Sequence, residues 1–448
     1  MNYLIIGLAK SGLGAIKLLE KNKENIFAYD ENKNLFDELR NKNKISENVK
    51  NIKKISIKTL KNIDYIVLSP GVNPKKYDRL SKKLNIKIIS ELELGSMFFN
   101  GDILTITGTN GKTTTVNLLF EMIKKVQPTC ELVGNVGNSF CEKIALNPNM
   151  KVAVCEASSF QLEKIEKFNS HIVGFLNIAD DHLNRYKNFD EYFNAKLNIF
   201  KNMRNFDILV LNYDDKTILE KVKKLDFQKL YFSLNMLPEN LFGAYLDNEK
   251  IIFKLKNKIE EISLTEISLT GKHNIYNIMC SCLMALCFGV NMGVIQEVLK
   301  NFKGLEHRIE FVDKIFDIDF YNDSKATNIH ASISAINSFD DKKVLLLLGG
   351  ENKGEDFNKL FKNLPKNVTK IITFGKMGKK ILKISQKNKF FNVTFTKSFK
   401  DIFKDIDFKN LNEDVVLLSP ACSSFDEFKS FEERGECFKF LVKGLKNE

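Results

Sequence analysis

Residues 108–114, with the sequence GTNGKTT, have the composition of a phosphate-binding loop. They follow a β-branched run at 102–107 that predicts a buried strand, and they precede residues 115–124, whose apolar side chains recur at helical spacing. A glycine turn between a strand and a helix presents backbone N–H groups and the positive end of the helix dipole to an anion. Lys112 adds a cation for the β- and γ-phosphates, and the Thr113 hydroxyl can bind Mg²⁺.

The match to the general phosphate-loop rule is incomplete, because that rule requires a glycine where this chain has Ile106. The loop here is the shorter pattern Gly-x-x-Gly-Lys-Thr. The structural alternative is an ordinary turn with a solvated lysine. The strand before the loop and the helix after it favour phosphate binding.

Two further predicted strands end in residues that could hold a metal ion. The run 151–155 ends at Glu156, and an acidic residue at a strand end downstream of a phosphate loop suits Mg²⁺. The run 171–178 leads to His182, which could bind a metal or act as an acid or base. Taken alone, Glu156 could also be an exposed acid at a helix start, and a single histidine is usually structural.

The N-terminus has a Rossmann-like opening, in which a strand, a glycine-containing turn at 7–14 and a helix precede a second strand that ends at Asp30. A dinucleotide fingerprint would need a glycine at Ala9, so a dinucleotide is only one option. The more general prediction is a phosphate near Ser11 and a polar contact near Asp30. An ordinary turn is the alternative. A later strand runs into Ser69-Pro70-Gly71, a second candidate binding turn.

The remainder of the chain carries two further candidate regions. Asn274 and Asn277 share one face of a predicted helix at 271–288 and could hydrogen-bond a purine edge, although helix capping would also explain them. Beyond a hinge at 304–308, four predicted strands each end in Gly, Ser, Asp or Lys. This pattern is typical of an open sheet whose edge of loops binds ligands.

Positioning these residues requires an α/β fold in three domains. We predict a Rossmann-like N-terminal domain at 1–94, a central P-loop ATPase domain with a mostly parallel sheet at 95–302, and a C-terminal Rossmann-like α/β domain at 303–448. With 448 residues, 44% of them hydrophobic, the chain can bury a sizeable core, and 28% charged residues is typical of a globular protein.

The net charge of +12 is spread along the chain without a run of five like charges, and no stacking or recognition module is visible, so we expect no nucleic-acid partner. The eight cysteines contain no C-x-x-C pair, which predicts reduced thiols in a cytosolic protein. The N-terminus lacks a signal peptide, and the apolar run 278–290 is too short to span a bilayer. We therefore expect a buried helix there and no membrane partner.

Together these motifs resemble the Mur ligase family of ATP-dependent amide-forming enzymes, from Tyr3 to the C-terminus. The shortened loop at 108–113 is similar to that family's form of the phosphate loop. The other matching motifs are EASSFQ at 156–161, Asp181-His182, Lys196, His273-Asn274, His307-Arg308 and NDSKATN at 322–328. Within the family, segments 323–328, 419–426 and 431–435 resemble the members that add D-glutamate.

The resemblance implies that ATP phosphorylates the free carboxylate of UDP-N-acetylmuramoyl-L-alanine. The amine of D-glutamate then attacks the acyl phosphate, and an amide forms through a tetrahedral intermediate. Such phosphoryl transfer needs positioning and charge neutralisation more than covalent chemistry. The resemblance also implies a cytoplasmic role in peptidoglycan precursor synthesis. We expect a monomer that closes over ATP and excludes water from the acyl phosphate.

The resemblance also assigns residues to the reaction. Lys112 and Lys325 would supply positive charge near the phosphates, while Thr113 and Glu156 would hold one Mg²⁺ and His182 would help to hold a second. Lys196 matches the lysine that the family carbamylates, which turns a cation into an oxygen ligand for a metal. The full set implied for ATP is Gly108, Thr109, Asn110, Gly111, Lys112, Thr113, Thr114, Asn274, Asn277, Arg308 and Asp323.

The substrate sites follow from the same resemblance. The set implied for the UDP substrate is Ser11, Asp30, Ser69, Gly71, Asn135 and His182. The set implied for D-glutamate is Thr327, Lys353, Ser424 and Phe431, with Lys353 pairing a carboxylate. Glu31 and Asn32 stand where the family often has a threonine and an arginine.

Three other interpretations remain open. One is a sister ligase that adds a different amino acid, including L-glutamate, or a folylpolyglutamate-type synthetase. Another is a non-catalytic nucleotide-binding switch or scaffold, which would need Lys112 and Thr113 but not the combination of Glu156, His182, Lys196 and Lys325. The last is an NAD-binding protein built on the N-terminal glycines.

Overall fold

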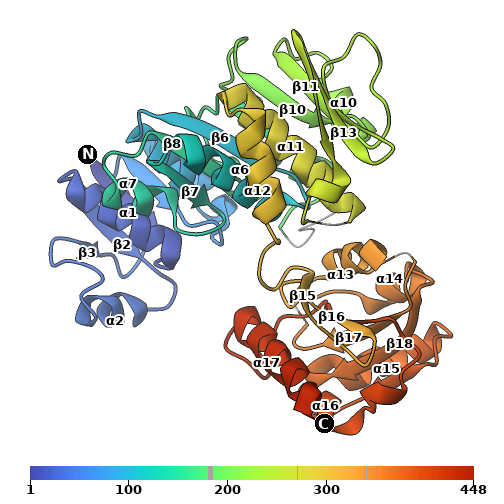
Figure 1. Cartoon of the computed structure of the whole chain (residues 1–448). Helices are drawn as coiled ribbons and strands as arrows, with labels where there is room; N and C mark the ends of the chain where they lie inside the picture. The colour runs from blue at the N-terminus through green and yellow to red at the C-terminus, as the bar shows by residue number, and fades with distance from the viewer. Residues whose placement is uncertain (180–184, 270, 340, 353, 448) are drawn as a thin grey trace. The chain divides into compact units, whose positions relative to one another are not determined.

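The computed structural model describes the whole chain except residues 180–184, 270, 340, 353 and 448 (Figure 1). The chain divides into two compact units. The first unit comprises residues 1–270 and 274–302, and it holds two sheets. The second unit comprises residues 271–273 and 303–448, and it holds one sheet. The α/β class predicted from the alternation of strands and helices is confirmed.

The first sheet has five parallel strands in the order β3-β2-β1-β4-β5. These strands are β3 (Lys50–Asn51), β2 (Asn25–Tyr29), β1 (Asn2–Ile6), β4 (Tyr65–Leu68) and β5 (Lys87–Ser90). Tyr3 and Ile5 pack on one face and Leu4 and Ile6 on the other, so both faces are buried, as in parallel sheets generally. The helices of this region are α1 (Lys10–Lys21), α2 (Leu35–Asn41), α3 (Ile57–Leu60), η1 (Pro74–Lys76), α4 (Asp78–Leu84) and α5 (Glu91–Met97).

The central sheet has nine strands in the order β14-β13-β12-β11-β10-β9-β6-β8-β7. They are β14 (Lys258–Ser263), β13 (Lys250–Leu255), β12 (Gly243–Asp247), β11 (Gln228–Ser233), β10 (Ile208–Asn212), β9 (Ile172–Phe175), β6 (Asp102–Thr107), β8 (Val152–Glu156) and β7 (Cys130–Gly134). All neighbouring strands from β7 across β8, β6, β9, β10 and β11 to β12 pair in parallel. The β12–β13 and β13–β14 pairs are antiparallel. Strand β6 lies between β8 and β9, with later strands continuing beyond β9, so the end of β6 is at the switch point where such sheets bind ligands.

Helices cover both faces of the central sheet. They are α6 (Lys112–Val126), α7 (Phe140–Leu146), α8 (Ser159–Leu162), α9 (Phe189–Leu197), η2 (Asn198–Phe200), α10 (Lys216–Val222), η3 (Leu264–Glu266), α11 (Lys272–Phe288) and α12 (Met292–Asn301). Helices α6, α11 and α12 pack on one face, and α7 to α10 supply apolar side chains to the other (Figure 1). The apolar run at 278–290 begins inside α11, and its residues 278–285 are buried, as predicted.

The N-terminal glycines serve close packing. A Cβ on Gly12 would lie 1.9 Å from the carbonyl oxygen of Gly7. A Cβ on Gly14 would lie 1.9 Å from Oγ of Ser139, which caps α7. These two glycines therefore let α1 approach the turn after β1 and the N-terminus of α7. This packing role explains glycines that also resemble part of a dinucleotide fingerprint.

Helix α5 ties the first sheet to the central one. Its Glu91 and Glu93 are both 1% exposed. Glu91 Oε1 accepts a hydrogen bond of 2.7 Å from the backbone N–H of Cys141, and burial raises the pKa of Glu91. The Glu93 carboxylate accepts three hydrogen bonds of 2.8–3.0 Å, from the backbone N–H groups of Glu166, Lys167 and Phe168. The predicted boundary at residue 94 falls inside this helix.

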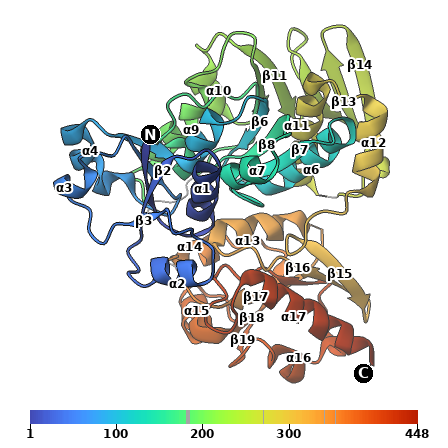
Figure 2. The ribbon, with the colours of Figure 1, turned by 90° about the vertical axis from the view of Figure 1, so that its left-hand side faces the viewer.

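The second unit contains one sheet in the order β15-β16-β20-β17-β18-β19, in which only the β15–β16 pair is antiparallel (Figure 2). Its strands are β15 (Glu310–Ile315), β16 (Ile318–Asn322), β20 (Val415–Leu418), β17 (Val344–Gly349), β18 (Val368–Phe374) and β19 (Val393–Phe395). Its helices are α13 (Ile329–Ile336), η4 (Asn337–Phe339), α14 (Phe357–Lys362), α15 (Gly375–Lys387), α16 (Ile402–Asp405), η5 (Phe408–Asn410), α17 (Phe431–Gly444) and η6 (Leu445–Asn447). Helices α13 to α15 cover one face, and α16 and α17 cover the other.

All eight cysteines are free thiols, and six of them are buried. Burial raises the pKa of Cys130 to about 12 and that of Cys141 well above its ordinary value. Such thiols stay protonated and unreactive at neutral pH, which agrees with the prediction of small apolar core residues. Among the described residues, no helix is both long enough and apolar enough to cross a membrane.

Candidate active site

The predicted phosphate loop connects the end of β6 to the start of α6, at the carboxyl edge of the central sheet. Gly111 caps α6 with a φ of +79°, which glycine adopts without strain. A Cβ on Gly111 would lie 2.2 Å from Oδ1 of Asn277, so the loop has no room for a side chain there. The start of α6 carries the positive end of the helix dipole, which makes it suitable for a phosphate.

Asn177, two residues beyond β9, holds the first half of the loop. Its Oδ1 accepts hydrogen bonds from the N–H groups of Thr109 and Asn110 at 3.2 and 2.8 Å. Its Nδ2 donates to the carbonyl of Asn110 at 3.2 Å. This role was not predicted from the sequence. The only signal was an amide side chain after a strand that neighbours β6.

Two lysines converge on one carbonyl of the loop. Lys112 Nζ and Lys196 Nζ donate to the carbonyl oxygen of Gly108 at 2.9 and 2.7 Å, and Lys112 also donates to the carbonyl of Thr109. Lys196 is 1% exposed, and its Nζ lies 5.0 Å from the ring centroid of Tyr192. The Tyr192 hydroxyl lies 3.0 Å from Oγ1 of Thr109. Lys196 is thus buried at the phosphate loop, whereas its sequence context alone indicated a solvated helix lysine.

Glu156 ends β8 beside this loop, since it pairs with Ile106 of β6 in the parallel register. It is 1% exposed, and its Oε1 accepts a hydrogen bond of 2.7 Å from Nδ2 of Asn135. Within the described part of the chain, its other oxygen, Oε2, is buried without a hydrogen-bond partner. A buried carboxylate oxygen left without a donor is costly, and a bound cation would satisfy it.

The unpaired Oε2 of Glu156 shows whether the residues of this site suit a bound Mg²⁺. Mg²⁺ prefers carboxylate and hydroxyl oxygen ligands. Glu156 supplies the carboxylate, and Thr113, at the start of α6 beside the same edge, supplies a hydroxyl. The residues present therefore fit one Mg²⁺. His182, the predicted ligand of a second Mg²⁺ and a predicted substrate contact, lies outside the described residues.

The two predicted adenine contacts lie behind the phosphate loop. Asn277 Oδ1 accepts a hydrogen bond of 3.1 Å from the hydroxyl of Thr115, and its Nδ2 donates to Oδ1 of Asn274 at 3.1 Å. Both asparagines are less than 10% exposed. In this arrangement Asn277 braces α6 against α11. Their contact with a purine remains a prediction.

Four of the predicted UDP-substrate residues, Ser11, Asp30, Ser69 and Gly71, lie at the carboxyl ends of β1, β2 and β4, whereas Asn135 follows β7 in the central sheet. Asp30 accepts a hydrogen bond of 2.8 Å from the N–H of Leu8, and the Ser69 hydroxyl donates to the carbonyl of Gly7 at 2.8 Å. Ser11 lies in the first turn of α1, and Gly71 is exposed. The fold thus brings these residues to one edge, on either side of the turn at residues 7–9.

Arg185 links this edge to the central sheet. Its guanidinium forms a bidentate pair with Glu163, at 3.0 and 2.8 Å, and Nη1 donates to the carbonyl of Pro70 at 2.9 Å. The same group lies 4.2 Å from the ring centroid of Phe160. The Arg185 and Glu163 side chains are only 12% and 14% exposed, so water screens this pair weakly. Arg185, which was not singled out from the sequence, therefore fixes the turn at 69–71.

We expect Arg185→Met to raise the KM for the UDP substrate by about tenfold while kcat changes less, because the turn loses its anchor but the phosphate loop is untouched. Steady-state phosphate release at varied UDP substrate measures both constants. Arg204→Met is the matched control, because Arg204 is exposed in the same unit. An unchanged KM in Arg185→Met would show that this anchor does not position the turn.

In the second unit, Asp323 follows β16 and is 6% exposed. Its Oδ2 accepts a hydrogen bond of 2.7 Å from the Ser419 hydroxyl, and its Oδ1 accepts one of 3.3 Å from the N–H of Ile309. Burial raises the pKa of Asp323 to about 7, although the positive charge of Arg308 opposes this rise. At neutral pH the carboxyl is therefore poised between its two protonation states.

This raised pKa predicts how stability depends on pH. Between about pH 4 and pH 7 the folded state keeps the Asp323 proton that the unfolded chain releases near pH 3.8, so Asp323 lowers stability as the pH rises. We expect Asp323→Asn to be more stable than the parent above pH 7, with a gain that shrinks by about 1.4 kcal/mol for each pH unit between pH 7 and pH 4. Urea unfolding from pH 4 to 8 measures the gain. Asp317→Asn, at an exposed site, should show no such trend.

Three predicted residues of the second unit meet at the start of α17. Lys325 Nζ lies 4.9 Å from the ring centroid of Phe431, and the His307 ring packs edge-on against the same ring at 6.0 Å. Ser424 is 2% exposed, and it and Thr327 follow the ends of the adjacent strands β20 and β16. The fold thus brings Lys325, Thr327, Ser424 and Phe431 to one sheet edge. Lys353, the fourth predicted D-glutamate contact, lies outside the described residues.

Arg434, a residue to which the sequence assigned no role, holds these loops together. It is 0% exposed, and burial lowers its pKa to about 10. Its Nε donates to the Ser324 hydroxyl at 2.9 Å, and Nη2 donates to the carbonyls of Ser324 and Cys422 at 2.8 and 3.1 Å. Since Ser324 follows β16 and Cys422 follows β20, Arg434 fixes the spacing of the two loops that carry the predicted D-glutamate contacts.

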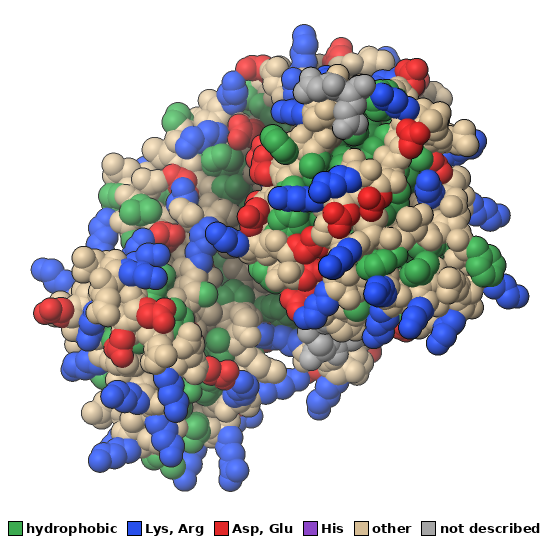
Figure 3. All heavy atoms as spheres, turned by 90° about the horizontal axis from the view of Figure 1, so that it is seen from below, with side chains coloured by type: hydrophobic (Ala, Val, Ile, Leu, Met, Phe, Trp, Pro, Cys, Tyr) green, Lys and Arg blue, Asp and Glu red, His purple; other side chains and the backbone are tan. Residues whose placement is uncertain are grey.

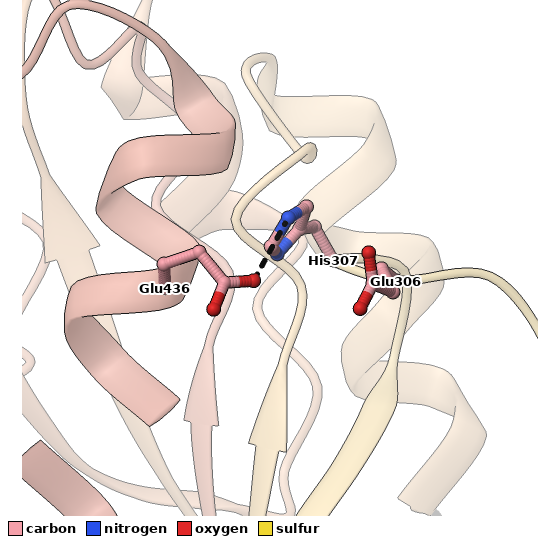
Figure 4. A group of neighbouring side chains, drawn as sticks. All are labelled: Glu306, His307 and Glu436. Atoms are coloured by element: carbon pink, nitrogen blue, oxygen red, sulfur yellow. Dashed lines mark ion pairs between the residues drawn. The ribbon is translucent and has the colours of Figure 1, made fainter. Parts of the chain in front are cut away.

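A cluster of Glu306, His307 and Glu436 has ligand atoms close enough to hold a metal ion (Figure 4). Nζ of Lys439, however, lies 3.3 Å from Glu306, 2.6 Å from Glu436 and 3.2 Å from Glu310. This ammonium pairs with all three carboxylates and offsets part of their negative charge. We interpret the cluster as an ion-pair network that connects α17 to the hinge.

Comparison with known proteins identifies the class. Residues 106–285 match the Mur ligase middle domain, and residues 307–422 match the Mur ligase glutamate ligase domain. The chain belongs to the Mur ligase family. It is 37% identical to a Clostridioides difficile protein and 38% identical to one from Alkaliphilus oremlandii, each over 99% of this chain and 98% of the relative. Both relatives are UDP-N-acetylmuramoylalanine–D-glutamate ligases.

Solved structures share the fold. A UDP-N-acetylmuramate–alanine ligase from Thermotoga maritima aligns with a TM-score of 0.61 at 16% identity. A pseudomurein peptide ligase type C from Methanothermus fervidus aligns with a TM-score of 0.60 at 17% identity. Each alignment covers 99% of both chains. The architecture of three sheets predicted from the motif order is therefore that of the family.

Proposed function

We propose that this protein is an ATP-dependent ligase that joins D-glutamate to UDP-N-acetylmuramoyl-L-alanine. The observation that carries the proposal is the similarity to D-glutamate ligases along nearly the whole chain, including the segments at 323–328, 419–426 and 431–435. The two lysines at the phosphate loop, Lys112 and the buried Lys196, and the unpaired Oε2 of Glu156 suit the phosphoryl transfer that such a ligase performs.

The reaction requires charge to be neutralised while a phosphoryl group passes between two anions. The alanyl carboxylate attacks the γ-phosphorus of ATP, ADP leaves, and an acyl phosphate forms. The D-glutamate amine then attacks the acyl carbon, loses a proton, and expels inorganic phosphate. We propose that Lys112 and Lys325 stabilise the charge on the transferring group, and that N–H groups at the start of α6 position the β- and γ-phosphates.

Mg²⁺ would supply further charge neutralisation at the phosphates when bound. We propose that Thr113 and Glu156 hold one ion and that His182 contributes to a second. We also propose that Lys196 is carbamylated. Its position against the carbonyl of Gly108, with Lys112 on the same oxygen, supports a change from cation to anion there, because a carbamate would relieve the crowding of two ammonium groups.

The remaining assignments are proposals of the same kind. Asn274 and Asn277 would face the adenine of ATP, and Arg308 and Asp323 would bind its phosphate and ribose. The UDP substrate would use Ser11, Asp30, Ser69, Gly71 and Asn135. D-glutamate would use Thr327, Lys353, Ser424 and Phe431. Glu31 forms an ion pair of 2.8 Å with Lys76, so a lysine reaches the edge where relatives often carry an arginine. We expect a cytoplasmic monomer.

The test is phosphate release from ATP with Mg²⁺ and UDP-N-acetylmuramoyl-L-alanine, with D-glutamate, L-glutamate, meso-diaminopimelate or L-lysine added one at a time. We expect turnover with D-glutamate alone. Turnover with a different amino acid would retain the ligase mechanism but overturn the assignment of Ser424, Lys353 and Phe431. An absence of turnover with all four, despite ATP binding, would favour a non-catalytic nucleotide-binding protein.

A further inference from the structure

One segment of the second unit has a charge composition unlike that of the chain as a whole. Residues 357–400 contain twelve lysines and no aspartate, glutamate or arginine, whereas the chain has 68 basic and 56 acidic residues in total. This segment covers α14, β18, α15 and β19. Figure 3 shows both signs of charge mixed on one face of the molecule, whereas this segment carries one sign only.

The fold gathers these lysines on one surface. Along α15 they recur at positions 376, 379, 380, 383 and 387, which is helical spacing, and all five are exposed. The opposite side of α15 is buried through Gly378, Ile381 and Ser385. Because the lysine side is turned away from the core, its ammonium groups face solvent.

Helix α14 adds its own lysines to the same surface. Nδ2 of Asn388, just beyond α15, donates to Oδ1 of Asn358 in α14 at 3.2 Å. The rings of Phe361 and Phe390 pack with centroids 6.2 Å apart. These contacts hold α14 against the end of α15. We name the resulting surface the α14–α15 basic face, and it consists of Lys359, Lys362, Lys380, Lys383, Lys387 and Lys389, all exposed.

Little acidic charge lies near this face in the described part of the protein: Asp356, which caps α14, interacts with Lys359 and Lys362, whereas Lys380, Lys383, Lys387 and Lys389 form no ion pair there. Of the twelve lysines in the segment, only Lys376 forms an ion pair within the described residues, with Glu351 at 2.7 Å. Other acidic residues of the second unit, for instance Glu432, Glu433 and Glu436, lie on α17, which covers the other face of the sheet. The α14–α15 basic face thus lies on one side of the domain. This arrangement suits contact with a broad, flat, anionic surface, whereas a nucleic-acid strand that wraps around the domain would need positive charge on several sides.

Two features favour a lipid surface over nucleic acid. The segment has no arginine, the residue preferred for nucleic-acid recognition, and clusters of four to eight basic residues on an amphipathic helix are typical of binding to anionic lipids. Phe391, two residues beyond Lys389, is 73% exposed. An exposed aromatic ring beside lysines can enter the lipid headgroup region while the ammonium groups contact phosphates.

We propose that the α14–α15 basic face adsorbs to membranes that carry anionic phospholipids. This peripheral contact needs no membrane-spanning helix, and it revises our expectation from the sequence that the protein has no membrane partner. The contact is independent of the proposed ligase reaction, since the α14–α15 basic face contains none of the residues assigned to ATP, metal or substrates.

Sedimentation of the full-length protein with vesicles tests the proposal. We expect binding to phosphatidylcholine vesicles that contain phosphatidylglycerol, little binding to pure phosphatidylcholine, and weaker binding as the salt concentration rises. Replacing Lys359, Lys383, Lys387 and Lys389 by glutamine should weaken binding by at least about tenfold. Phe391→Ser should weaken it by a smaller factor. Phosphate release in solution should stay unchanged in both variants.

The matched control replaces four exposed lysines of the first unit, Lys216, Lys221, Lys223 and Lys224, by glutamine, so that the net charge changes equally. This control should bind vesicles like the parent. Equal loss of binding in the two four-lysine variants would overturn the proposal, because net charge alone would then explain it. Equal binding to neutral vesicles, no binding to anionic ones, or displacement from vesicles by duplex DNA at the same salt concentration would also overturn it.

Discussion

Glu156→Gln is expected to lower phosphate release by about 10²–10³-fold, with the fold intact. The glutamine would keep an oxygen for the hydrogen bond from Asn135, but it would replace the orphaned Oε2 by an NH₂ group. An amide nitrogen does not bind Mg²⁺, so the ion that this oxygen fits would lose its carboxylate ligand. The same change removes a buried charge, so the metal-free variant should be at least as stable to heat as the parent.

Three measurements separate these effects: phosphate release at saturating substrates, its dependence on Mg²⁺ concentration, and thermal unfolding without the metal. Glu131→Gln is the matched control, because Glu131 lies on the neighbouring strand β7 and pairs with Lys143 at 2.7 Å. The control should retain nearly full turnover. Nearly full turnover in Glu156→Gln itself, without a higher requirement for Mg²⁺, would exclude Glu156 as a metal ligand.

Gly111→Ala is expected to weaken ATP binding by at least about a hundredfold and to lower the melting temperature. An alanine at a φ of +79° carries backbone strain of about 1–2 kcal/mol. Its Cβ would also lie 2.2 Å from Oδ1 of Asn277, so that either the loop or α11 must shift. Over-packing of this kind costs about 1–3 kcal/mol, and the shift would displace the N–H groups at the start of α6.

Calorimetric titration with a non-hydrolysable ATP analogue measures the affinity. Gly289→Ala separates strain from collision, because Gly289 has a φ of +99° and a Cβ added there would meet no atom within 4 Å. We expect Gly289→Ala to lose stability but to keep its affinity for the analogue. If the two variants bound the analogue equally well, the phosphate loop would not require the close approach of Asn277.

The strands that could be predicted from the sequence are those buried on both faces. β6, β8 and β17 are continuous apolar or β-branched runs, because helices cover the sheet on both sides. The strands that were missed include β14 and β15, with the sequences KIEEIS and EFVDKI. These are edge strands whose charged residues face water, so their hydrophobic signal is weak.

The same distinction applies to the site. The phosphate loop is a local feature, in which strand, glycines, Lys112 and Thr113 are consecutive, so the sequence alone predicted it. Lys196 reaches Gly108 across 88 positions, and Arg434 reaches Ser324 across 110. Spacing along the chain carries no information about such contacts. Only the resemblance to the family indicated Lys196. Arg434 lies in the matching segment 431–435, but nothing in the sequence indicated which groups it contacts.

The buried carboxylates of α5 have a consequence for protein engineering. A chimera that exchanged the first sheet for that of a relative, with a junction near residue 94, would divide Glu91 and Glu93 from the backbone groups that they bind in α7 and in residues 166–168. If α7 and residues 166–168 came from the same donor protein as the first sheet, both buried carboxylates would keep their own hydrogen-bond partners. Exchange of the first sheet of this protein therefore requires three separate segments to be exchanged together, and a single junction is not enough.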